Sequence, residues 1–295
     1  MKKTLITGAT GSLGGAVAKF LKEKGSVEQI AVLVRDTESD TAKALAKQGF
    51  ELRVADYNNS DALSEAFKGI EVLYFVSGSD IGSRVPQHKN VVKAAENSSI
   101  EHIFYTSVSL NGLSKEAPLY NAMAIHLDTE QWIKDARLTY TFLRHNLYSE
   151  VIAMFLGDKK QVLGSKTVYL PTGTGKTAFV PRIELAEIGA NVLADPEQHA
   201  NKTYELNGSH KITFGEIATE LSNITGEPIA YVSPEVEVFE KTMQGYGVPA
   251  EYIGMMSSFG QGIADGVFDS PSSDLESLLG RTSQPVPEFL KEVYS

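Results

Sequence analysis

The sequence contains no cysteine among its 295 residues, which excludes disulfide bonds and thiolate metal sites and indicates a reducing compartment. It has no apolar run of ~18 residues, the length that a membrane-spanning helix needs. The basic start, Met1-Lys2-Lys3, leads into an apolar run that stops at Gly8, too early for the core of a signal peptide. We therefore expect a soluble, cytoplasmic protein without a membrane span.

Positive charge is scarce as well. Lysine and arginine number 27 against 37 aspartates and glutamates, so the net charge is −10. This charge disfavours non-specific attraction to nucleic acid, and we expect no nucleic-acid partner. The hydrophobic share of 42% and the charged share of 22% are ordinary for a globular protein of one or two domains.

The first half alternates short apolar runs with helix-like stretches. The runs cover residues 4–7, 29–34, 51–54, 72–76, 102–106 and 140–143, and the helix-like stretches 12–24, 40–48, 61–67, 86–97 and 122–135. Strands separated by helices of this length indicate βαβ crossovers. We therefore predict an α/β fold of Rossmann type, a doubly wound parallel sheet with its ligand crevice at the carboxyl ends of the strands.

The second half does not continue this alternation of strand and helix. It contains helix candidates between glycine- and proline-rich links, at residues 183–194, 214–224, 235–244 and 272–280. We predict an NADP-binding Rossmann domain over residues 1–150. Residues 151–295 would mainly form a smaller α/β substrate lobe that closes the crevice, with later segments returning to the first domain.

A glycine-rich stretch, LPTGTGKTAF at residues 170–179, imitates a nucleotide-binding P-loop. The P-loop pattern needs glycine at its first position, a preceding strand and a following helix. Here Leu170 holds the first position, and Pro181 would break the helix. The β-branched and aromatic flanks, 167–169 and 177–180, favour two strands joined by a turn.

A second glycine-rich stretch meets the requirements of a phosphate loop. The first strand runs directly into Gly8, Ala9, Thr10, Gly11, Ser12, Leu13 and Gly14, and a helix follows. Such glycines permit a tight turn, backbone approach to pyrophosphate and close helix–strand packing, while the helix N terminus offers free N–H groups. The spacing G-x-x-G-x-x-G predicts a dinucleotide site; the alternative is a tight turn without ligand.

The ends of the next strands carry further cofactor candidates. Arg35 follows the second strand and suits the 2′-phosphate of NADP, so NADP(H) is favoured over NAD(H), although Asp36 complicates this choice. Asp56 ends the third strand, where it would contact adenine or cap a turn. Three small residues follow the fourth strand and would admit the cofactor, namely Ser77, Gly78 and Ser79.

These residues resemble the short-chain dehydrogenase/reductase superfamily in its extended, atypical branch. The segments 85–95, 102–107, 140–150 and 202–206 narrow the resemblance to the NmrA-like group, and within it to bacterial NAD(P)H:quinone oxidoreductases and triphenylmethane reductases. The likeness covers most of the chain. It implies an NAD(P)-binding Rossmann-fold oxidoreductase.

By this resemblance the cofactor would touch residues 8–13, Arg35, residues 77–79, and the stretch His145, Asn146, Leu147, Tyr148, Ser149 and Glu150, which would pass the nicotinamide and line the substrate pocket. Thr106 and Ser107 match the serine position of the superfamily. The superfamily's tyrosine acid, Y-x-x-x-K, is incomplete: after Tyr120, position 124 holds alanine. This loss argues against alcohol dehydrogenase and sugar epimerase chemistry.

The missing acid favours one class of hydride acceptor. A reduced quinone is a hydroquinone anion of modest basicity, whereas a reduced carbonyl is a strongly basic alkoxide that needs a positioned acid. We therefore predict an NADPH-dependent reductase of a quinone or a similar flat, apolar, electron-poor molecule. The alternative is a redox sensor of the NmrA type that binds NADP without turnover.

Three residues remain as candidates for substrate orientation or proton donation. His126 stands one helical turn before Glu130, so the two would form a proton relay or, alternatively, a helix-surface pair. Asn146 and Tyr148 would donate to an acceptor oxygen, although Tyr148 would equally serve packing. With no third ligand beside His126 and Glu130, no metal site is expected.

Overall fold

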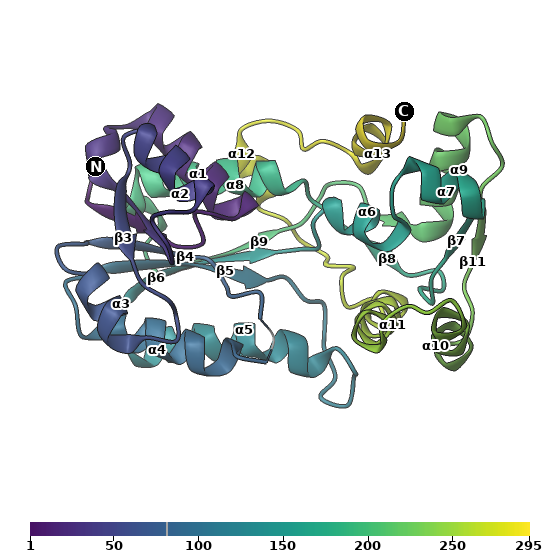
Figure 1. Cartoon of the computed structure of the whole chain (residues 1–295), viewed down its shortest axis with the longest axis horizontal. Helices are drawn as coiled ribbons and strands as arrows, with labels where there is room; N and C mark the ends of the chain where they lie inside the picture. Colours follow the sequence, from purple (N-terminus) through teal and green to yellow (C-terminus); the bar gives the residue numbers. More distant parts are fainter. Residues whose placement is uncertain (81) are drawn as a thin grey trace.

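The computed structural model describes residues 1–80 and 82–295. Its centre is a seven-stranded sheet in the order β3-β2-β1-β4-β5-β6-β9, with every pairing parallel (Figure 1). The predicted doubly wound α/β fold is confirmed. The strands are β1 (Thr4–Ile6), β2 (Ile30–Val34), β3 (Glu51–Val54), β4 (Val72–Phe75), β5 (His102–Val108), β6 (Thr139–His145) and β9 (Lys202–Leu206).

Helices cover both faces of this sheet (Figure 1). One face packs against α1 (Ser12–Lys24), α2 (Asp40–Lys47), α8 (Arg182–Ala194) and α12 (Leu275–Leu279), and the other against α3 (Ser60–Ala66), α4 (Arg84–Glu96) and α5 (Tyr120–Asp135). The apolar stripe of α1 is buried at Leu13, Val17 and Leu21, as its helical spacing predicts. Because both faces are covered, the central strands are apolar throughout rather than alternating.

The smaller lobe lies beyond the carboxyl ends of β5 and β6 (Figure 1). Its apolar cluster includes Val108, the last residue of β5, and Leu147, two residues past the end of β6. Its helices are α6 (Glu150–Leu156), α7 (Lys159–Ser165), α9 (Phe214–Thr225), α10 (Val236–Gly245), α11 (Ala250–Ala264) and α13 (Val286–Tyr294). Two small sheets complete it, β7 (Thr167–Tyr169) with β11 (Ala230–Val232) and β8 (Lys176–Thr177) with β10 (Ile212–Thr213). Short 3-10 turns lie at Val27–Gln29 and Pro196–His199.

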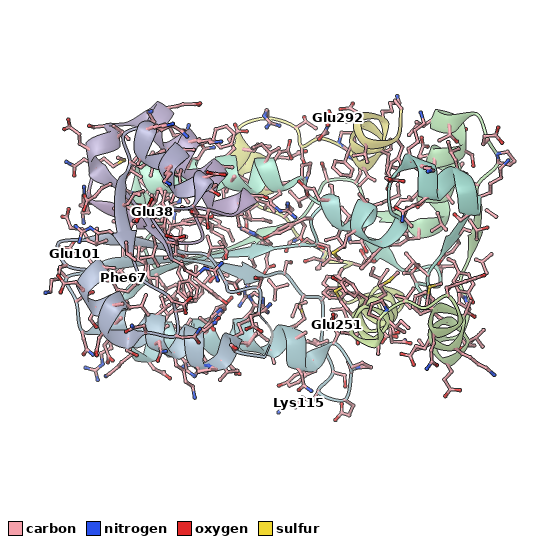
Figure 2. The ribbon with its side chains drawn as sticks, viewed as in Figure 1. Glu38, Phe67, Glu101, Lys115, Glu251 and Glu292 are labelled. Carbon is pink, nitrogen blue, oxygen red and sulfur yellow. The ribbon has the colours of Figure 1, made fainter. Side chains whose placement is uncertain are left out.

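Side chains fill the space between the layers (Figure 2). Phe67 is fully buried inside, whereas Glu101, Lys115 and Glu251 project outward. No helix within the described ranges is both long and apolar enough to cross a membrane.

The sequence prediction was incomplete in the second half. It missed α6, α7, α11 and α13, and the helix predicted over 272–280 is limited to Leu275–Leu279, which packs on α8. In α11 the glycines obscured the pattern, because glycine is a poor helix former. Gly260 is nevertheless required there, since a Cβ would lie 2.8 Å from Cγ of Pro171.

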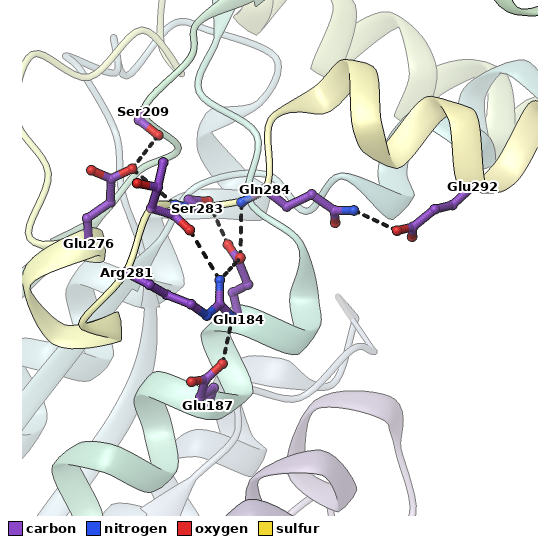
Figure 3. Close-up of polar contacts among 9 residues, drawn as sticks. Glu184, Glu187, Ser209, Glu276, Arg281, Ser283, Gln284 and Glu292 are labelled. Carbon is purple, nitrogen blue, oxygen red and sulfur yellow. Dashed lines mark hydrogen bonds and ion pairs between the residues drawn. The ribbon is translucent and has the colours of Figure 1, made fainter.

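A strap of residues 281–284 ties the end of α12 to α8 before the chain enters α13 (Figure 3). The buried carboxylate of Glu184 accepts hydrogen bonds from Arg281 Nη1 at 2.6 Å, Ser283 Oγ at 2.6 Å and the Gln284 N–H at 3.0 Å. Arg281 also pairs with Glu187 at 2.7 Å. Because this buried charge is fully partnered, the strap anchors the lobe to the Rossmann half.

Candidate functional site

The glycine loop of residues 8–14 lies between β1 and the N terminus of α1. Gly8 has φ +62°, a conformation that favours glycine. A Cβ on Gly14 would lie 2.6 Å from the carbonyl oxygens of both Thr7 and Gly8, so helix and strand touch only because this residue lacks a side chain. In the described part of the chain no side chain caps α1, whose first N–H groups are left for an anion.

A cavity of about 370 Å³ adjoins this loop. It touches Ala9, Thr10, Gly11 and Ser12 and continues between α1 and α2. None of its lining residues comes from β5 or β6. Most of the lining lies along the sides of α1 and α2, as far as Glu23 and Gln48, so the cavity touches the glycine loop at one end and is not the place where a hydride acceptor would lie.

Arg35 and Asp36 follow β2 and differ in their surroundings. The Asp36 carboxylate accepts the Glu38 N–H at 2.8 Å, while Ser39 is the N-cap of α2 and accepts the Ala42 N–H. Arg35 is exposed, and residues 1–80 and 82–295 give it no hydrogen bond or ion pair. Asp36 is thus committed to a local turn, which leaves the guanidinium of Arg35 as the group able to meet a phosphate.

Asp56 also holds a turn. Its Oδ1 accepts the backbone N–H of Asn58 at 2.8 Å and the amide of the same residue at 2.7 Å. Asn59 then caps α3 by accepting the Ala62 N–H. The turn-capping alternative for Asp56 is therefore present in the structure.

The turn after β4 is held by three side chains from other elements. The N–H of Val76 donates to Thr7 Oγ1 at 2.9 Å, that of Ser77 to Thr106 Oγ1 at 2.9 Å, and that of Gly78 to a buried histidine, His88, at 3.1 Å. A Cβ on Gly78 would lie 3.0 Å from Gln87 Oε1, so α4 fills the space beside it. Ser79 is exposed at the end of the turn.

Ser107 and Glu130 belong to one buried network. The Ser107 hydroxyl donates to Glu130 Oε1 at 2.6 Å, and Arg144 donates to both oxygens of that carboxylate at 2.8 and 2.7 Å. Arg144 also reaches Glu205 at 2.9 Å, which joins α5 to β5, β6 and β9. The surface-pair alternative is therefore wrong for Glu130, since its carboxylate is buried against arginine.

His126 is partly buried and faces other partners. Its Nδ1 lies 3.1 Å from the Tyr105 hydroxyl, and Arg84 Nη1 donates toward its Nε2 at 3.4 Å. Burial and the Arg84 charge hold the pKa of His126 well below its usual value of 6.5. The imidazole is therefore neutral near pH 7, and it contacts Tyr105 and Arg84, whereas the sequence offered either a relay with Glu130 or a surface pair with it.

Asn146 is committed to the interior. Its amide nitrogen donates to Asn207 Oδ1 at 2.7 Å and to the carbonyl of Phe268 at 3.0 Å, while its Oδ1 accepts the Leu147 N–H at 2.7 Å. An amide has two N–H donors, and both are used. Donation from Asn146 to a substrate therefore gains no support from this geometry.

Tyr148 lies at the edge of the crevice, between His145 and Arg182. Its hydroxyl is 3.3 Å from His145 Nδ1, and the Arg182 guanidinium lies 4.8 Å from its ring centre. Burial raises the pKa of Tyr148 to about 12 and lowers that of His145 to about 3. Both groups are therefore neutral near pH 7.

The rest of the 145–150 stretch contacts other parts of the protein, although the buried His145 Nε2 and Ser149 Oγ have no hydrogen-bond partner among the described residues. Both oxygens of the Glu150 carboxylate accept the Arg182 N–H at 3.2 Å, which caps α8. Leu147 and Ser149 are buried. Tyr148 and Glu150 alone in this stretch are partly exposed, and Tyr148 is its candidate for a ligand contact.

Sequence reasoning missed four members of this region, His88, Arg84, Tyr105 and Arg182. His88 and Tyr105 lie within the 85–95 and 102–107 segments that carried the family resemblance, which was the signal available for them. Within the described ranges no group of three acidic, histidine or cysteine residues is placed to hold a metal ion.

The chain was compared with known proteins. The model of the NmrA-like family matches residues 1–289. Quinone oxidoreductase 2 of Escherichia coli (strain K12) is 32% identical over 295 residues, which cover 98% of each chain.

Two solved structures are similar over nearly the whole chain. The triphenylmethane reductase of Citrobacter sp. complexed with NADP(H) has 34% identity and a TM-score of 0.88, with 98% of this chain and 99% of that one covered. The NADPH-dependent quinone oxidoreductase of Escherichia coli complexed with NADPH has 32% identity and a TM-score of 0.90, with 99% and 100% covered. The predicted resemblance is confirmed, and the chain belongs to the NmrA-like family.

Proposed function

We propose that this chain, an NADPH-dependent oxidoreductase, passes hydride to quinones or to similarly flat, electron-poor acceptors. The observation that carries the proposal is a cofactor crevice without a strong acid. Position 124 on α5 holds alanine where a lysine would assist a tyrosine acid, His126 and His145 are neutral, and burial raises the pKa of Tyr148. An acceptor whose reduced form is a weak base needs no such acid.

The fit of the crevice to NADPH supports this proposal. The uncapped N terminus of α1 and the side-chain-free face at Gly14 suit a pyrophosphate. Arg35 would hold the 2′-phosphate with charge-assisted hydrogen bonds, and the turn of residues 77–79 would lie against the nicotinamide half. Bound NADPH supplies the hydride. The residues of the chain orient the two reactants and exclude water.

The relatives agree with this chemistry, since one is a quinone oxidoreductase and the other a triphenylmethane reductase. Quinones and triphenylmethane dyes are both conjugated and electron-poor, and neither yields an alkoxide on reduction. These relatives favour a reductase over an NADP-binding sensor without turnover.

Tyr148 is the residue that we assign to the acceptor side. Its ring is held by the Arg182 guanidinium and its hydroxyl by His145. A ring fixed in this way would stack on or edge against a flat acceptor. With its high pKa, Tyr148 would act in orientation rather than as an acid at neutral pH.

The test mixes purified protein with NADPH and a small naphthoquinone and follows the loss of reduced-nicotinamide absorbance against a protein-free blank. NADH runs in parallel. We expect saturable oxidation of NADPH. Tight NADPH binding without turnover across quinones, dyes and carbonyls would reject the reductase and favour the sensor.

The variant Arg35→Ala tests the phosphate role in the same assay. We expect its KM for NADPH to rise about tenfold, the equivalent of one lost charge-assisted contact of ~1.4 kcal/mol, with the KM for NADH unchanged. The charge-matched control is Lys47→Ala, which removes an exposed positive charge at the end of α2. Equal effects on NADPH and NADH would contradict the assignment.

A further inference from the structure

A buried histidine joins the turn after β4 to α5. His88 is 0% exposed, and its ring lies 4.9 Å from the Phe75 ring and 5.9 Å from the Tyr105 ring, between centroids. Its Nε2 accepts the Gly78 N–H at 3.1 Å and lies 3.4 Å from Ser77 Oγ. Its Nδ1 lies 2.8 Å from Thr129 Oγ1 on α5. One side chain thus spans the gap between the turn and the helix.

The hydrogen bonds assign the tautomer of His88. The Thr129 hydroxyl donates its only proton to the Ile125 carbonyl at 2.6 Å, so its oxygen must accept from His88 Nδ1–H. The Nε2 atom then carries the lone pair that the Gly78 N–H requires. Burial lowers the pKa of His88 to about 3, which keeps the ring neutral. Thr129 therefore sets which nitrogen faces the turn.

The hydrogen bond from the Gly78 N–H to His88 holds the outer end of the turn, and the hydrogen bonds of the two preceding N–H groups hold its inner end. The Val76 and Ser77 N–H groups donate to Thr7, the residue that follows β1, and to Thr106, which lies within β5. The Gly78 N–H is the outermost of the three, and His88 is its recorded acceptor. Without His88 the Gly78 N–H would lose its acceptor. The inner part of the turn would stay held by Thr7, Thr106 and the Tyr57 hydroxyl, which lies 2.9 Å from the Val76 carbonyl oxygen, so the loss would fall on the outer part of the turn.

We propose that His88, oriented by Thr129, is a positioning residue that holds the turn of residues 77–79 in the shape that binds NADPH. The inference rests on the proposed placement of this turn at the cofactor. His88 acts through the turn and touches neither reactant. Its loss should weaken NADPH binding while the KM for the quinone stays the same.

The chain contains a matched control for this pair. His102 Nε2 lies 2.8 Å from Thr141 Oγ1, both residues are buried, and Thr141 likewise donates to a backbone carbonyl, that of His199 at 2.7 Å. This second pair lies at the beginning of β5, the end of the sheet opposite the crevice. Thr141→Val therefore removes the same kind of bond at a place remote from the cofactor.

The experiment measures the dissociation constant of NADPH by fluorescence titration, together with both KM values and the melting temperature, for Thr129→Val, Thr129→Ser and Thr141→Val. Valine keeps the shape of threonine, so the fold tolerates it better than the hole that His88→Ala would leave. We expect Thr129→Val to raise the NADPH dissociation constant about fivefold, as for one lost neutral hydrogen bond. Thr129→Ser and Thr141→Val should stay within twofold of the original protein.

Similar melting temperatures for the two valine variants, with weaker NADPH binding in Thr129→Val alone, support the proposal. Equal NADPH affinities in the two valine variants would overturn it, and so would weak binding in Thr129→Ser. Because the titration needs no turnover, a protein that binds NADPH but reduces no quinone would reject the proposed function and still test His88.

Discussion

Two glycine-rich loops of this chain look alike in sequence and differ in structure. Residues 8–14 follow β1 and open the 13-residue helix α1. Residues 170–177 follow β7 and end in the two-residue strand β8, with the next helix, α8, starting only at Arg182. The strand predicted over 167–169 is β7, whereas the one predicted over 177–180 is reduced to β8, Lys176–Thr177. They pair with β11 and β10 rather than with each other.

The polar groups of the second loop are used within the protein. The Gly173 N–H donates to Ser233 Oγ at 2.8 Å, and the Gly175 N–H to the carbonyl of Thr172 at 3.0 Å. The Thr172 hydroxyl lies 2.6 Å from that of Tyr231. In contrast, the first N–H groups of α1 lack a side-chain cap among the described residues. A glycine motif indicates that another group lies close to the backbone. The surrounding elements determine whether that group is a ligand or part of a helix.

The largest expected effect comes from Gly14→Ala. The added Cβ would meet two backbone carbonyls at 2.6 Å, and neither can move without shifting β1 or α1. We expect a loss of stability on the order of 3 kcal/mol and no measurable NADPH binding in the fraction that folds. Urea unfolding and NADPH titration measure the two effects. A variant that binds NADPH normally would show that the loop is only a tight turn.

Gly175→Ala should be as destabilising but should spare the cofactor. Its Cβ would clash with the carbonyl oxygen of Ile263 on α11, so the loop would separate from the lobe. We expect a stability loss of about 3 kcal/mol by urea unfolding, with the NADPH dissociation constant of the folded protein within twofold of normal. A tenfold weaker affinity at full folding would mean that the second loop does contact the cofactor.

Lys176→Ala should have the smallest effect. This residue holds the position of the P-loop lysine, but its side chain is exposed on β8. We expect stability within about 0.5 kcal/mol of normal and unchanged NADPH affinity, as for an exposed surface substitution. We expect ATP to leave the melting temperature unchanged in both the original protein and the Lys176→Ala variant. A rise with ATP in the original protein that is lost in the variant would contradict the comparison.

Much of the first half could be predicted because its signals are local. Apolar runs such as 29–34 and 72–76 anticipate β2 and β4 to within one residue at each end. The prediction ended β5 at Thr106 and β6 at Leu143, whereas the strands continue to Val108 and His145. These last residues are held by pairing with each other across the sheet, Val108 opposite His145, and a local pattern does not record that pairing.

The candidate site was predicted in part for the same reason. Its glycines and Arg35 lie at strand ends, where position along the chain already indicates position in the fold. Glu130 pairs with Arg144 and His126 contacts Tyr105, and both partners come from other elements. The spacing of the two residues along one helix could not show that they have different partners. His88 was missed as a bridge because its partners, Gly78 and Thr129, lie on opposite sides of it in sequence.

The sequence by itself determined the alternation of strand and helix, the glycine-rich turn between β1 and α1 and the missing lysine at position 124, because each depends on neighbours within a few residues. Only the tertiary structure decided which polar groups remain available. Asn146 and Glu130 have the chemistry of a site, but segments distant in the chain, at Phe268 and Arg144, satisfy their hydrogen bonds. Most buried polar groups have a hydrogen-bond partner, and which partner each one finds is set by the packing of the whole chain. In the described residues His145 Nε2 and Ser149 Oγ are exceptions.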